Sequence, residues 1–317
     1  MIEGKRILIT GGGGFIGSTL AEPLLENNEV VVYDNFSRDS LQHKAYKDHP
    51  NLTVIEGDVL DYDAVREAIE GAAVVVHCAA IAGIDTVIAS PVTTMRVNMI
   101  GSANVLQAAS EWGGCDRVLC FSTSEIFGQH AFRSDETDPA VLGQVGEARW
   151  TYAVSKLAEE HLAIAYYKEL QLPTTVVRPF NIYGPGQIGD GALRTFVKRA
   201  IKDEPIEIHG DGTQIRAWCY VDDMVAGALI ALEHPDAVGE AFNIGNQRAI
   251  VTIYGLASAV IRVLESRSDI TFTRKDYADV ELRVPSVEKA RRLIGFEAKV
   301  DLEEGIRRTA EYYRHHD

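Results

Sequence analysis

The chain has 317 residues, and its 46% hydrophobic and 24% charged residues make the ordinary balance of a globular protein, which argues against long disordered segments. Its 31 basic and 46 acidic residues give a formal charge of −15, which disfavours nucleic acid and anionic membrane surfaces as partners. No apolar run approaches the roughly 18 to 20 residues that span a bilayer, and the four scattered cysteines have neither disulfide-frame nor metal-site spacing. We therefore expect a soluble cytoplasmic protein without a bound metal ion.

Short apolar runs alternate with helical patterns through the first half of the chain. The runs are rich in β-branched residues, as is typical of strands buried on both faces of a parallel sheet. We expect strands over residues 7–9, 30–33, 53–55, 73–76, 118–121 and 174–177, and helices over residues 18–26, 64–69, 94–112 and 152–170. Repeated alternation of this kind predicts a doubly wound α/β sheet of the Rossmann type, with right-handed crossovers.

The composition changes after the sixth expected strand, where proline, glycine and asparagine gather over residues 178–191. This is loop chemistry, and it indicates a domain boundary. We expect a Rossmann domain over residues 1–178 and a smaller C-terminal α/β lobe over residues 179–317, with some crossing of the chain between the two. The length supports two such units, because domains commonly have about 150 residues.

Three glycines between the first strand and the first helix, Gly11, Gly14 and Gly17, have the spacing GxxGxxG. Missing side chains allow a tight turn and let the backbone approach a pyrophosphate at the helix N-terminus. A glycine turn that binds nothing is the alternative, but the strand–turn–helix context favours a bound dinucleotide.

Acidic residues at the ends of the next two strands refine this prediction. Asp34 lies 17 residues after Gly17, where a carboxylate accepts hydrogen bonds from the adenosine ribose and repels a 2′-phosphate. This favours NAD over NADP, although the nearby Arg38 weakens the preference. Asp58 follows the third strand and is expected at the adenine edge, with a cap on the following helix as the alternative.

Tyr152 and Lys156 are four residues apart at the start of a helical pattern and therefore share one face of the helix. A lysine ammonium lowers the pKa of a neighbouring phenol, and a phenolate can take the proton of a sugar hydroxyl while hydride leaves the same carbon. Thr123, at the end of the fifth strand, can share the hydrogen bond to the reacting oxygen, because ligands bind at this edge of a parallel sheet. The alternative is that Tyr152 and Lys156 are ordinary surface residues of a helix and that the segment around Thr123 is a simple turn. His77 is interpreted as a wall of the cofactor cleft and not as a base.

With these residues in place, the chain resembles the extended short-chain dehydrogenases/reductases of the nucleotide-sugar epimerase/dehydratase family over nearly its full length. The matching segments are the glycine loop and residues 77–80, 122–128, 152–156, 178–185 and 210–216. The resemblance implies NAD as cofactor, a nucleotide-sugar substrate held by the second lobe and oxidation at C4 of the sugar. It also implies a homodimer that pairs through residues 94–112 and 152–170 of each subunit.

The resemblance implies the remaining site residues as well. Asn181 would contact the diphosphate or the sugar, Ser124 would lie beside the sugar, and Arg216 and Arg274 would bind phosphate oxygens, since a guanidinium grips phosphate with two hydrogen bonds. Besides Tyr152 and Lys156, the cofactor site is expected to include Phe15, Ile16, Asn35, Val59, Ala79, Ala80, Asn98 and Ser122.

Three reactions of this family make different demands on the residues after Thr123. A 4-epimerase needs only that threonine with the tyrosine and lysine. A 4,6-dehydratase typically carries an aspartate where this chain has Ser124, which cannot protonate a leaving hydroxyl effectively. The segment that carries Glu125 and the segment 279–286, which carries Arg283, are similar to the corresponding segments of UDP-glucuronate decarboxylases, including UDP-xylose synthases.

The chemistry also fits a decarboxylase, because oxidation at C4 of a glucuronate makes a β-keto acid that loses carbon dioxide readily. Glu125 and Arg283 would orient the carboxylate and deliver a proton to C5; a structural ion pair and a phosphate grip are their alternatives. We expect a UDP-glucuronate decarboxylase, then a UDP-sugar 4-epimerase, then a 4,6-dehydratase. A catalytically silent NAD-sensing module is the alternative outside enzymes, and the intact set of Thr123, Tyr152 and Lys156 argues against it.

Overall fold

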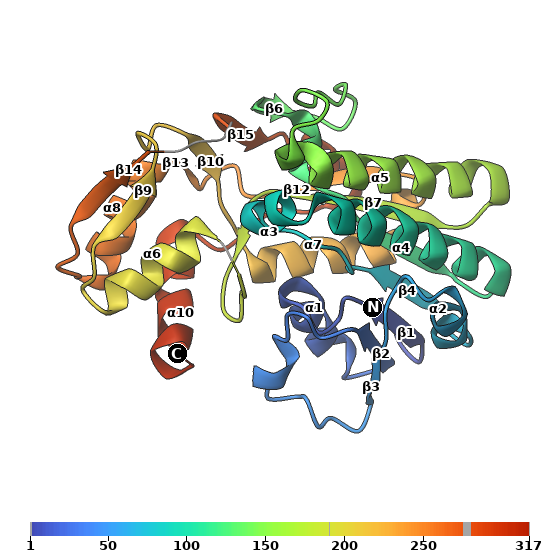
Figure 1. Ribbon diagram of the computed structural model, residues 1–317. Coiled ribbons are helices and arrows are strands. Elements are labelled where there is room, and N and C mark those ends of the chain that lie inside the picture. The colour runs from blue at the N-terminus through green and yellow to red at the C-terminus, as the bar shows by residue number, and fades with distance from the viewer. Residues whose placement is uncertain (1, 190, 275–279, 317) are drawn as a thin grey trace.

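The computed structural model describes residues 2–189, 191–274 and 280–316, and its centre is a parallel sheet (Figure 1). The seven strands lie in the order β12-β7-β5-β4-β1-β2-β3. They are β1 (Arg6–Thr10), β2 (Glu29–Asp34), β3 (Leu52–Glu56), β4 (Val74–His77), β5 (Arg117–Phe121), β7 (Thr174–Pro179) and β12 (Ala241–Ile244). The expected doubly wound sheet is confirmed, and each of the expected strands is present within it.

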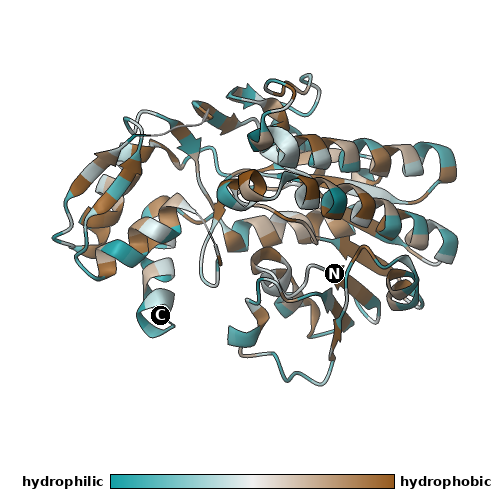
Figure 2. Cartoon of the chain, viewed as in Figure 1, coloured by the Kyte–Doolittle hydropathy of each residue, from teal (hydrophilic) through white to brown (hydrophobic). Residues whose placement is uncertain are grey.

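Helices cover both faces of this sheet. One face carries α2 (Tyr62–Ile69), α4 (Pro91–Trp112) and α5 (Thr151–Leu170), and the other carries α1 (Phe15–Leu24) and α7 (Val221–Glu233). Buried apolar side chains of these helices, such as Leu20, Val65 and Val105, pack with those of the strands. Hydrophobic residues (brown) and hydrophilic residues (teal) both occur along the helices in Figure 2. The short helix α3 (Ile84–Ala89) lies between β4 and α4.

The strand β12 has no counterpart among the expected strands. It pairs in parallel with β7, with Ala241 opposite Val176, and it follows α7, so residues well past position 178 complete the large sheet. In the opposite sense, β6 (His130–Ser134) comes from the first half of the chain but pairs with β15 (Leu282–Pro285) in the smaller lobe. The chain therefore crosses between the lobes, and the division after residue 178 stays a prediction.

Within the described residues, the smaller lobe is built from short sheets and helices, and α9 (Glu288–Ile294) packs against β12 of the large sheet. A four-stranded sheet has the order β13-β10-β15-β6, and two-stranded sheets pair β8 with β11 and β9 with β14. The bounds are β8 (Ile182–Tyr183), β9 (Ile206–His209), β10 (Ile215–Ala217), β11 (Cys219–Tyr220), β13 (Ile250–Thr252), β14 (Ile270–Thr273), α6 (Ala192–Ile201), α8 (Ile253–Leu264), α9 (Glu288–Ile294) and α10 (Leu302–His315). Short 3-10 helices occupy Leu41–His43, Ser124–Phe127, Ala148–Trp150 and Pro235–Ala237.

The two lobes share one apolar core. A continuous cluster of buried side chains runs from Ile7 of β1 through Met224 of α7 to Leu256 of α8. Buried apolar contact of this kind is the main favourable term in folding, so the lobes stabilise each other. Within the described ranges, no helix combines the length and the apolar character of a membrane span.

A buried ion pair fixes α5 against the sheet. The Arg178 guanidinium on β7 donates to both oxygens of Glu160 on α5, at 2.5 to 3.1 Å. Both side chains are about nine-tenths buried, and such pairs are geometrically demanding because each buried charge needs its partner. The pair sets the rotation of α5, and thereby the direction in which Tyr152 and Lys156 point.

Candidate active site

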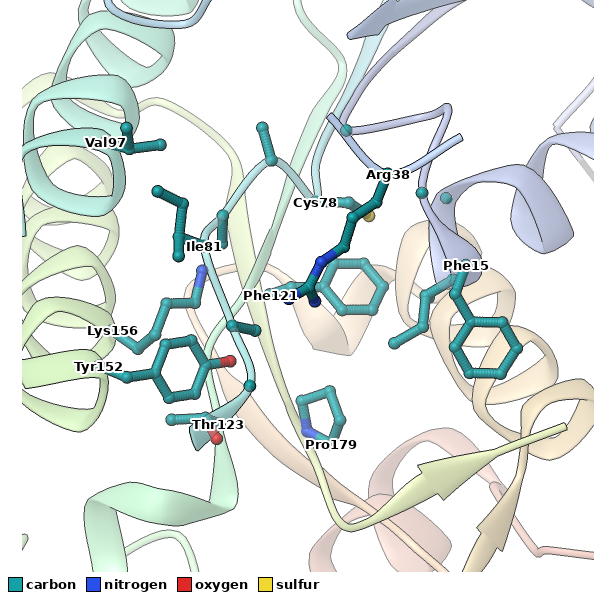
Figure 3. A pocket seen from close by; sticks show the side chains of 18 of the residues that line it. Phe15, Arg38, Cys78, Ile81, Val97, Phe121, Thr123, Tyr152, Lys156 and Pro179 are labelled. Carbon is teal, nitrogen blue, oxygen red and sulfur yellow. The ribbon is translucent and has the colours of Figure 1, made fainter. Parts of the chain in front are cut away.

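A cavity of about 440 Å³ lies at the carboxyl ends of β1, β2, β4 and β5, closed on the far side by residues that follow β7 (Figure 3). This is the edge at which doubly wound sheets bind ligands. Most of the predicted site residues line this cavity. Asn98, Arg216 and Arg274 are the predicted residues that do not.

The glycine loop leaves one end of the cavity open for a ligand. A Cβ atom at Gly11 would lie 2.4 Å from the backbone nitrogen of Ala79, and one at Gly17 would lie 2.4 Å from the carbonyl oxygen of Gly11. Gly11 also has a φ of +71°, which side chains rarely tolerate. Gly14 begins α1 without a side-chain cap, so the N–H groups of the first turn are available to an anion. This cradle fits the pyrophosphate of a dinucleotide, with Phe15 and Ile16 beside it.

Asp34 lies at the cavity wall, where its carboxylate already accepts two backbone hydrogen bonds. The donors are the N–H groups of Gly13, at 2.9 Å, and Phe36, at 2.8 Å. Burial nevertheless raises the pKa of Asp34 above its usual value. Arg38 reaches into the cavity in Figure 3, and its guanidinium donates to Thr86 Oγ1 at 2.9 Å. The carboxylate and the guanidinium thus both face the nucleotide end.

The other residues predicted to contact the nucleotide line the cavity, and the structure excludes the alternative role of Asp58. Asn35, Asp58, Val59, Ala79 and Ala80 line the cavity. The alternative role of Asp58 as a helix cap is wrong, because α2 is capped by Asp61, which accepts from the N–H of Ala64.

Asn98 lies one layer behind the wall in which it was predicted. Its side chain is fully buried on α4 and exchanges two hydrogen bonds with the backbone of Ile81, at 2.8 and 3.1 Å. It also donates to Ser155 Oγ on α5. Asn98 therefore positions the loop after β4 and does not face the cavity. Its short side-chain amide makes its hydrogen bonds with the backbone of that loop.

The two predicted phosphate-binding arginines lie outside the cavity wall. Arg216 is buried on β10, where its guanidinium donates to the carbonyl of Ile215 at 3.1 Å. Arg274 is exposed at the end of β14. Asp279, the first residue of the segment 279–286, lies outside the described residues. Phosphate binding by these arginines stays a prediction.

Tyr152, Lys156 and Thr123 converge at the other end of the cavity. Tyr152 is the second residue of α5, Lys156 lies one turn later, and Thr123 follows β5 (Figure 3). Thr123 caps a 3-10 helix by accepting the N–H of Glu125 at 3.2 Å, which fixes its side chain, and it shares a hydrogen bond with Tyr152. Ser122, Ser124 and Asn181 line the same end.

The surroundings of the Tyr152 phenol favour its protonated form. Burial raises the pKa of Tyr152, and the nearby Glu125 and Glu159 push it in the same direction. Lys156 lowers the pKa, as predicted, but its effect is smaller than that of burial. The lysine charge therefore matters for activation without being sufficient for it.

Glu125 is held between two guanidinium groups. Arg149 donates to its two oxygens at 2.6 and 3.3 Å, and Arg283 donates to Oε1 at 3.4 Å. Although burial opposes ionisation, Arg283 and Arg149 together hold the pKa of Glu125 below its usual value. Its surroundings thus favour the ionised carboxylate of Glu125, which is not a ready proton donor.

Arg149 and Glu159 were not predicted as part of the site, and His77 was predicted as one of its walls. Arg149 lies only three residues before Tyr152, a spacing that could have suggested a shared location. His77 is buried beneath the cavity and does not form its wall; its ring contacts Thr10 Oγ1 at 2.7 Å and Ser102 Oγ at 2.9 Å. Glu159 binds Lys156, and no local sequence signal marks it.

A glycine cradle for a dinucleotide and a tyrosine–lysine pair at one cavity of a parallel sheet define an NAD-dependent enzyme. The chain belongs to the NAD dependent epimerase/dehydratase family, whose sequence model matches residues 7–245.

Three relatives illustrate the range of that family. The chain is 33% identical to a UDP-N-acetyl-alpha-D-glucosaminuronate decarboxylase of Bacillus cytotoxicus, covering 98% of each sequence. It is 34% identical to UDP-glucuronic acid decarboxylase 5 of Arabidopsis thaliana, covering 98% of this chain and 89% of the relative. A solved UDP-glucuronic acid 4-epimerase from Bacillus cereus, in complex with UDP-glucuronic acid and NAD, is 27% identical with a TM-score of 0.89, covering 98% and 100% of the two chains.

The position of Asp34 predicts a preference between cofactors. We expect NAD to bind at least about tenfold more tightly than NADP, because the carboxylate repels a 2′-phosphate at short range. Asp34→Ala should narrow this gap, and Asp48→Ala, which removes an exposed carboxylate away from the cavity, should leave it unchanged. Calorimetric dissociation constants check both, and equal values for NAD and NADP in the unmodified protein would contradict the prediction.

The Arg149–Glu125–Arg283 cluster predicts a pH-dependent stability difference. At neutral pH, Glu125→Gln should lower the free energy of unfolding by about 3 kcal/mol, because two buried guanidinium groups lose their carboxylate. The folded-state pKa of Glu125 is depressed, so its contribution is complete above the unfolded pKa and is lost as pH falls through the folded pKa. Urea unfolding at several pH values measures this, with the exposed Glu281→Gln as control. A difference that does not shrink in acid would speak against an ionised Glu125.

Proposed function

We propose that the protein is a UDP-glucuronate decarboxylase that works through oxidation at C4 of the sugar. The observation that carries this proposal is the cluster of Arg149, Glu125 and Arg283 at the reaction end of the cavity. Two guanidinium groups around one carboxylate leave one excess positive charge there, within a protein of net charge −15. Such a local reversal of sign favours an anionic group on the substrate, as the C6 carboxylate of a uronate is.

The names of the relatives support a UDP-linked uronate as substrate. Two curated relatives are named as decarboxylases of such sugars, and the Bacillus cereus structure contains UDP-glucuronic acid. A carboxylate at C6 is common to all three substrates. The cluster around Glu125 supplies the groups that would recognise it.

The first step assigns the C4 hydroxyl proton to Tyr152. Its phenol shares a hydrogen bond with Thr123 and lies within the influence of Lys156, so the three groups can bind one sugar oxygen together. NAD bound on the glycine loop supplies the acceptor for the hydride that leaves C4. The Tyr152 phenol first releases its own proton to solvent, and Lys156 favours the resulting phenolate because its ammonium is an opposite charge at short distance. The phenolate then takes the proton of the C4 hydroxyl.

The second step uses the β-keto acid that C4 oxidation produces. Carbon dioxide leaves as its bonding electrons pass into an enolate, and the hydroxyl groups of Tyr152 and Thr123 stabilise the enolate oxygen. Arg283 orients the carboxylate before it leaves. When Arg283 turns from Glu125 to the substrate, Glu125 loses one of the two guanidinium groups that hold its pKa down. Glu125 can then take a proton from solvent and deliver it to C5.

A 4-epimerase is the second candidate, favoured by the Bacillus cereus relative, whose structure contains UDP-glucuronic acid and NAD and whose name is a 4-epimerase. It would use the same Thr123, Tyr152 and Lys156 and bind the same carboxylate. A 4,6-dehydratase has less support, because the buried Ser124 occupies the place of its expected acid.

The reaction itself separates these candidates by mass. With UDP-glucuronate and NAD, a decarboxylase that returns the hydride to C4 would yield a nucleotide sugar lighter by one carbon dioxide. One that releases the 4-keto sugar would yield a product lighter by two further hydrogens, together with free NADH. A 4-epimerase yields a product of unchanged mass. Mass spectrometry of the product therefore decides. The N-acetylated uronate is tested in parallel, because the Bacillus cytotoxicus relative is named for it. An unchanged mass with both substrates overturns the decarboxylase.

Variants separate the two steps. Tyr152→Phe should stop both, because the phenol that takes the O4 proton is gone. Glu125→Gln should leave C4 oxidation in place and slow decarboxylation by about tenfold to a hundredfold, in the range expected for a lost acid–base group. The matched control Glu281→Gln removes an exposed carboxylate two residues before Arg283 and should behave as the unmodified enzyme. A wild-type rate in Glu125→Gln would remove Glu125 from the chemistry.

We also infer a homodimer that pairs through α4 and α5. These helices pack side by side, and their outward faces expose apolar side chains, with Val92 71% and Ile100 44% exposed, together with Met99 and Val154. Exposed apolar residues gathered on two adjacent helices favour a four-helix interface. A cytoplasmic location likewise stays a prediction, drawn from the cysteine pattern.

Light scattering at micromolar concentration should give about twice the chain mass of 34.8 kDa. Ile100→Glu should shift the protein toward the monomer, because a charge enters the apolar contact. Val54→Glu, which changes an exposed valine on β3 away from these helices, is the control. A monomeric unmodified protein would refute the inference.

A further inference from the structure

Glu159 is a buried carboxylate that the steps above do not use. It lies on α5, one turn after Lys156, and its Oε2 atom accepts a hydrogen bond from the lysine Nζ at 2.5 Å. The side chains of Lys156 and Glu159 are 2% and 0% exposed. Lys156 lines the cavity, and Glu159 lies behind it. The pair therefore forms a layer of charge directly beneath the reacting groups.

Other charged groups near the lysine do not replace this contact. Glu160 is bound to Arg178, and Glu125 is bound to its two arginines. On β4 and β5, His77 has its pKa lowered to about 3 by burial and by Lys156, and burial raises the pKa of the Cys78 and Cys120 thiols, so all three are neutral. Among the described residues, Glu159 is thus the carboxylate that compensates Lys156.

A second element holds Glu159 in place. The Ser102 hydroxyl on α4 lies 3.0 Å from Glu159 Oε2, and it shares its one hydrogen between that oxygen and the carbonyl oxygen of Asn98 at 2.5 Å. The same hydroxyl contacts His77. The other oxygen, Oε1, is buried and makes no hydrogen bond within the described part of the chain. The carboxylate is therefore held by the one oxygen that faces Lys156.

Compensation matters because a buried ammonium without a partner loses its proton. Burial alone pushes the pKa of Lys156 down, and Glu159 is the largest influence that pushes it up, so that it ends above the usual value. A neutral lysine would no longer favour the phenolate of Tyr152. Glu159 therefore affects the pKa of the Tyr152 phenol indirectly, by keeping Lys156 protonated.

We propose that Glu159 is a positioning residue: it is the buried counter-ion that holds the Lys156 ammonium in place and keeps it charged beside Tyr152. This rests on the proposed C4 oxidation, a step that the decarboxylase and the 4-epimerase have in common. It assigns Glu159 no contact with the substrate. Glu159 acts only through Lys156.

The direct test measures the ionisation of Lys156 without any substrate. Carbon-13 NMR of NAD-loaded protein labelled at the lysine ε-carbon follows each lysine through a pH titration, and Lys156→Met identifies the relevant signal. In Glu159→Gln, Lys156 should titrate at least about one pH unit below the ~10.4 of an ordinary lysine. In the unmodified protein it should titrate above that value. Equal titration in both overturns the proposal.

Two further variants make this comparison specific. Glu159→Asp keeps the charge and should keep Lys156 protonated. Glu169→Gln removes an exposed carboxylate from the same helix and should change nothing. A shift of similar size in Glu169→Gln would mean that helix charge in general is responsible, and would overturn the role of Glu159.

The pH profile of turnover gives an independent readout. In Glu159→Gln, kcat should fall as pH rises through the lowered pKa of Lys156, with KM unchanged, while the unmodified enzyme keeps its rate over that range. A merely structural role would lower kcat equally at all pH values and would contradict the proposal. If the enzyme does not decarboxylate its substrate, the proposed function is wrong, but the NMR titration still tests the role of Glu159 because it uses no substrate.

If Glu159→Gln does not fold, the double variant Glu159→Gln/Lys156→Met decides. Removing the ammonium as well removes the uncompensated buried charge. Recovery of the fold in the double variant supports the counter-ion role. Failure to recover means that Glu159 is required for packing alone, and the proposal falls.

Discussion

Compensation of buried charge is the constraint on which the site depends. Within nine residues of α5, the helix carries the buried Lys156, Glu159 and Glu160, and Tyr152, which lines the cavity. An ionised group in such surroundings is costly unless a partner is in contact with it. Each charge has one: Glu160 binds Arg178 of β7, and Lys156 binds Glu159. The Tyr152 phenol, left neutral among these pairs, is the group whose charge can change during a reaction.

Much of the sheet could be predicted because its signals are local. A buried parallel strand requires a short run of β-branched residues, and the glycine loop requires missing side chains at fixed positions, where an added Cβ would meet the backbone of Ala79. The strand β12 escaped prediction, because four residues without a strong β-branched run have no local signature. It becomes a strand only by pairing with β7.

The site was predictable where residues follow a strand end or share a helix face, as Asp34 and the Tyr152–Lys156 pair do. Contacts between distant segments were not predictable from physical reasoning on the sequence, since Glu125 and Arg283 are 158 residues apart. Resemblance to known enzymes pointed to that pair, but it also placed Asn98 in the cofactor site, where its amide in fact binds the backbone of Ile81. Such side chains act one layer behind the surface that a ligand touches.

The completion of the large sheet by β12 has a consequence for how such enzymes can be divided or recombined. A fragment that stops at residue 178 keeps the glycine loop, Tyr152 and Lys156, yet it loses β12 and α7. One edge of β7 and the face of α1 that α7 covers would then be exposed, and unpaired strand edges invite aggregation. The smaller lobe is therefore not a detachable module. A chimaera that exchanges it must retain residues 221–244 from the same parent as the sheet, grafting the new lobe as insertions on either side of them.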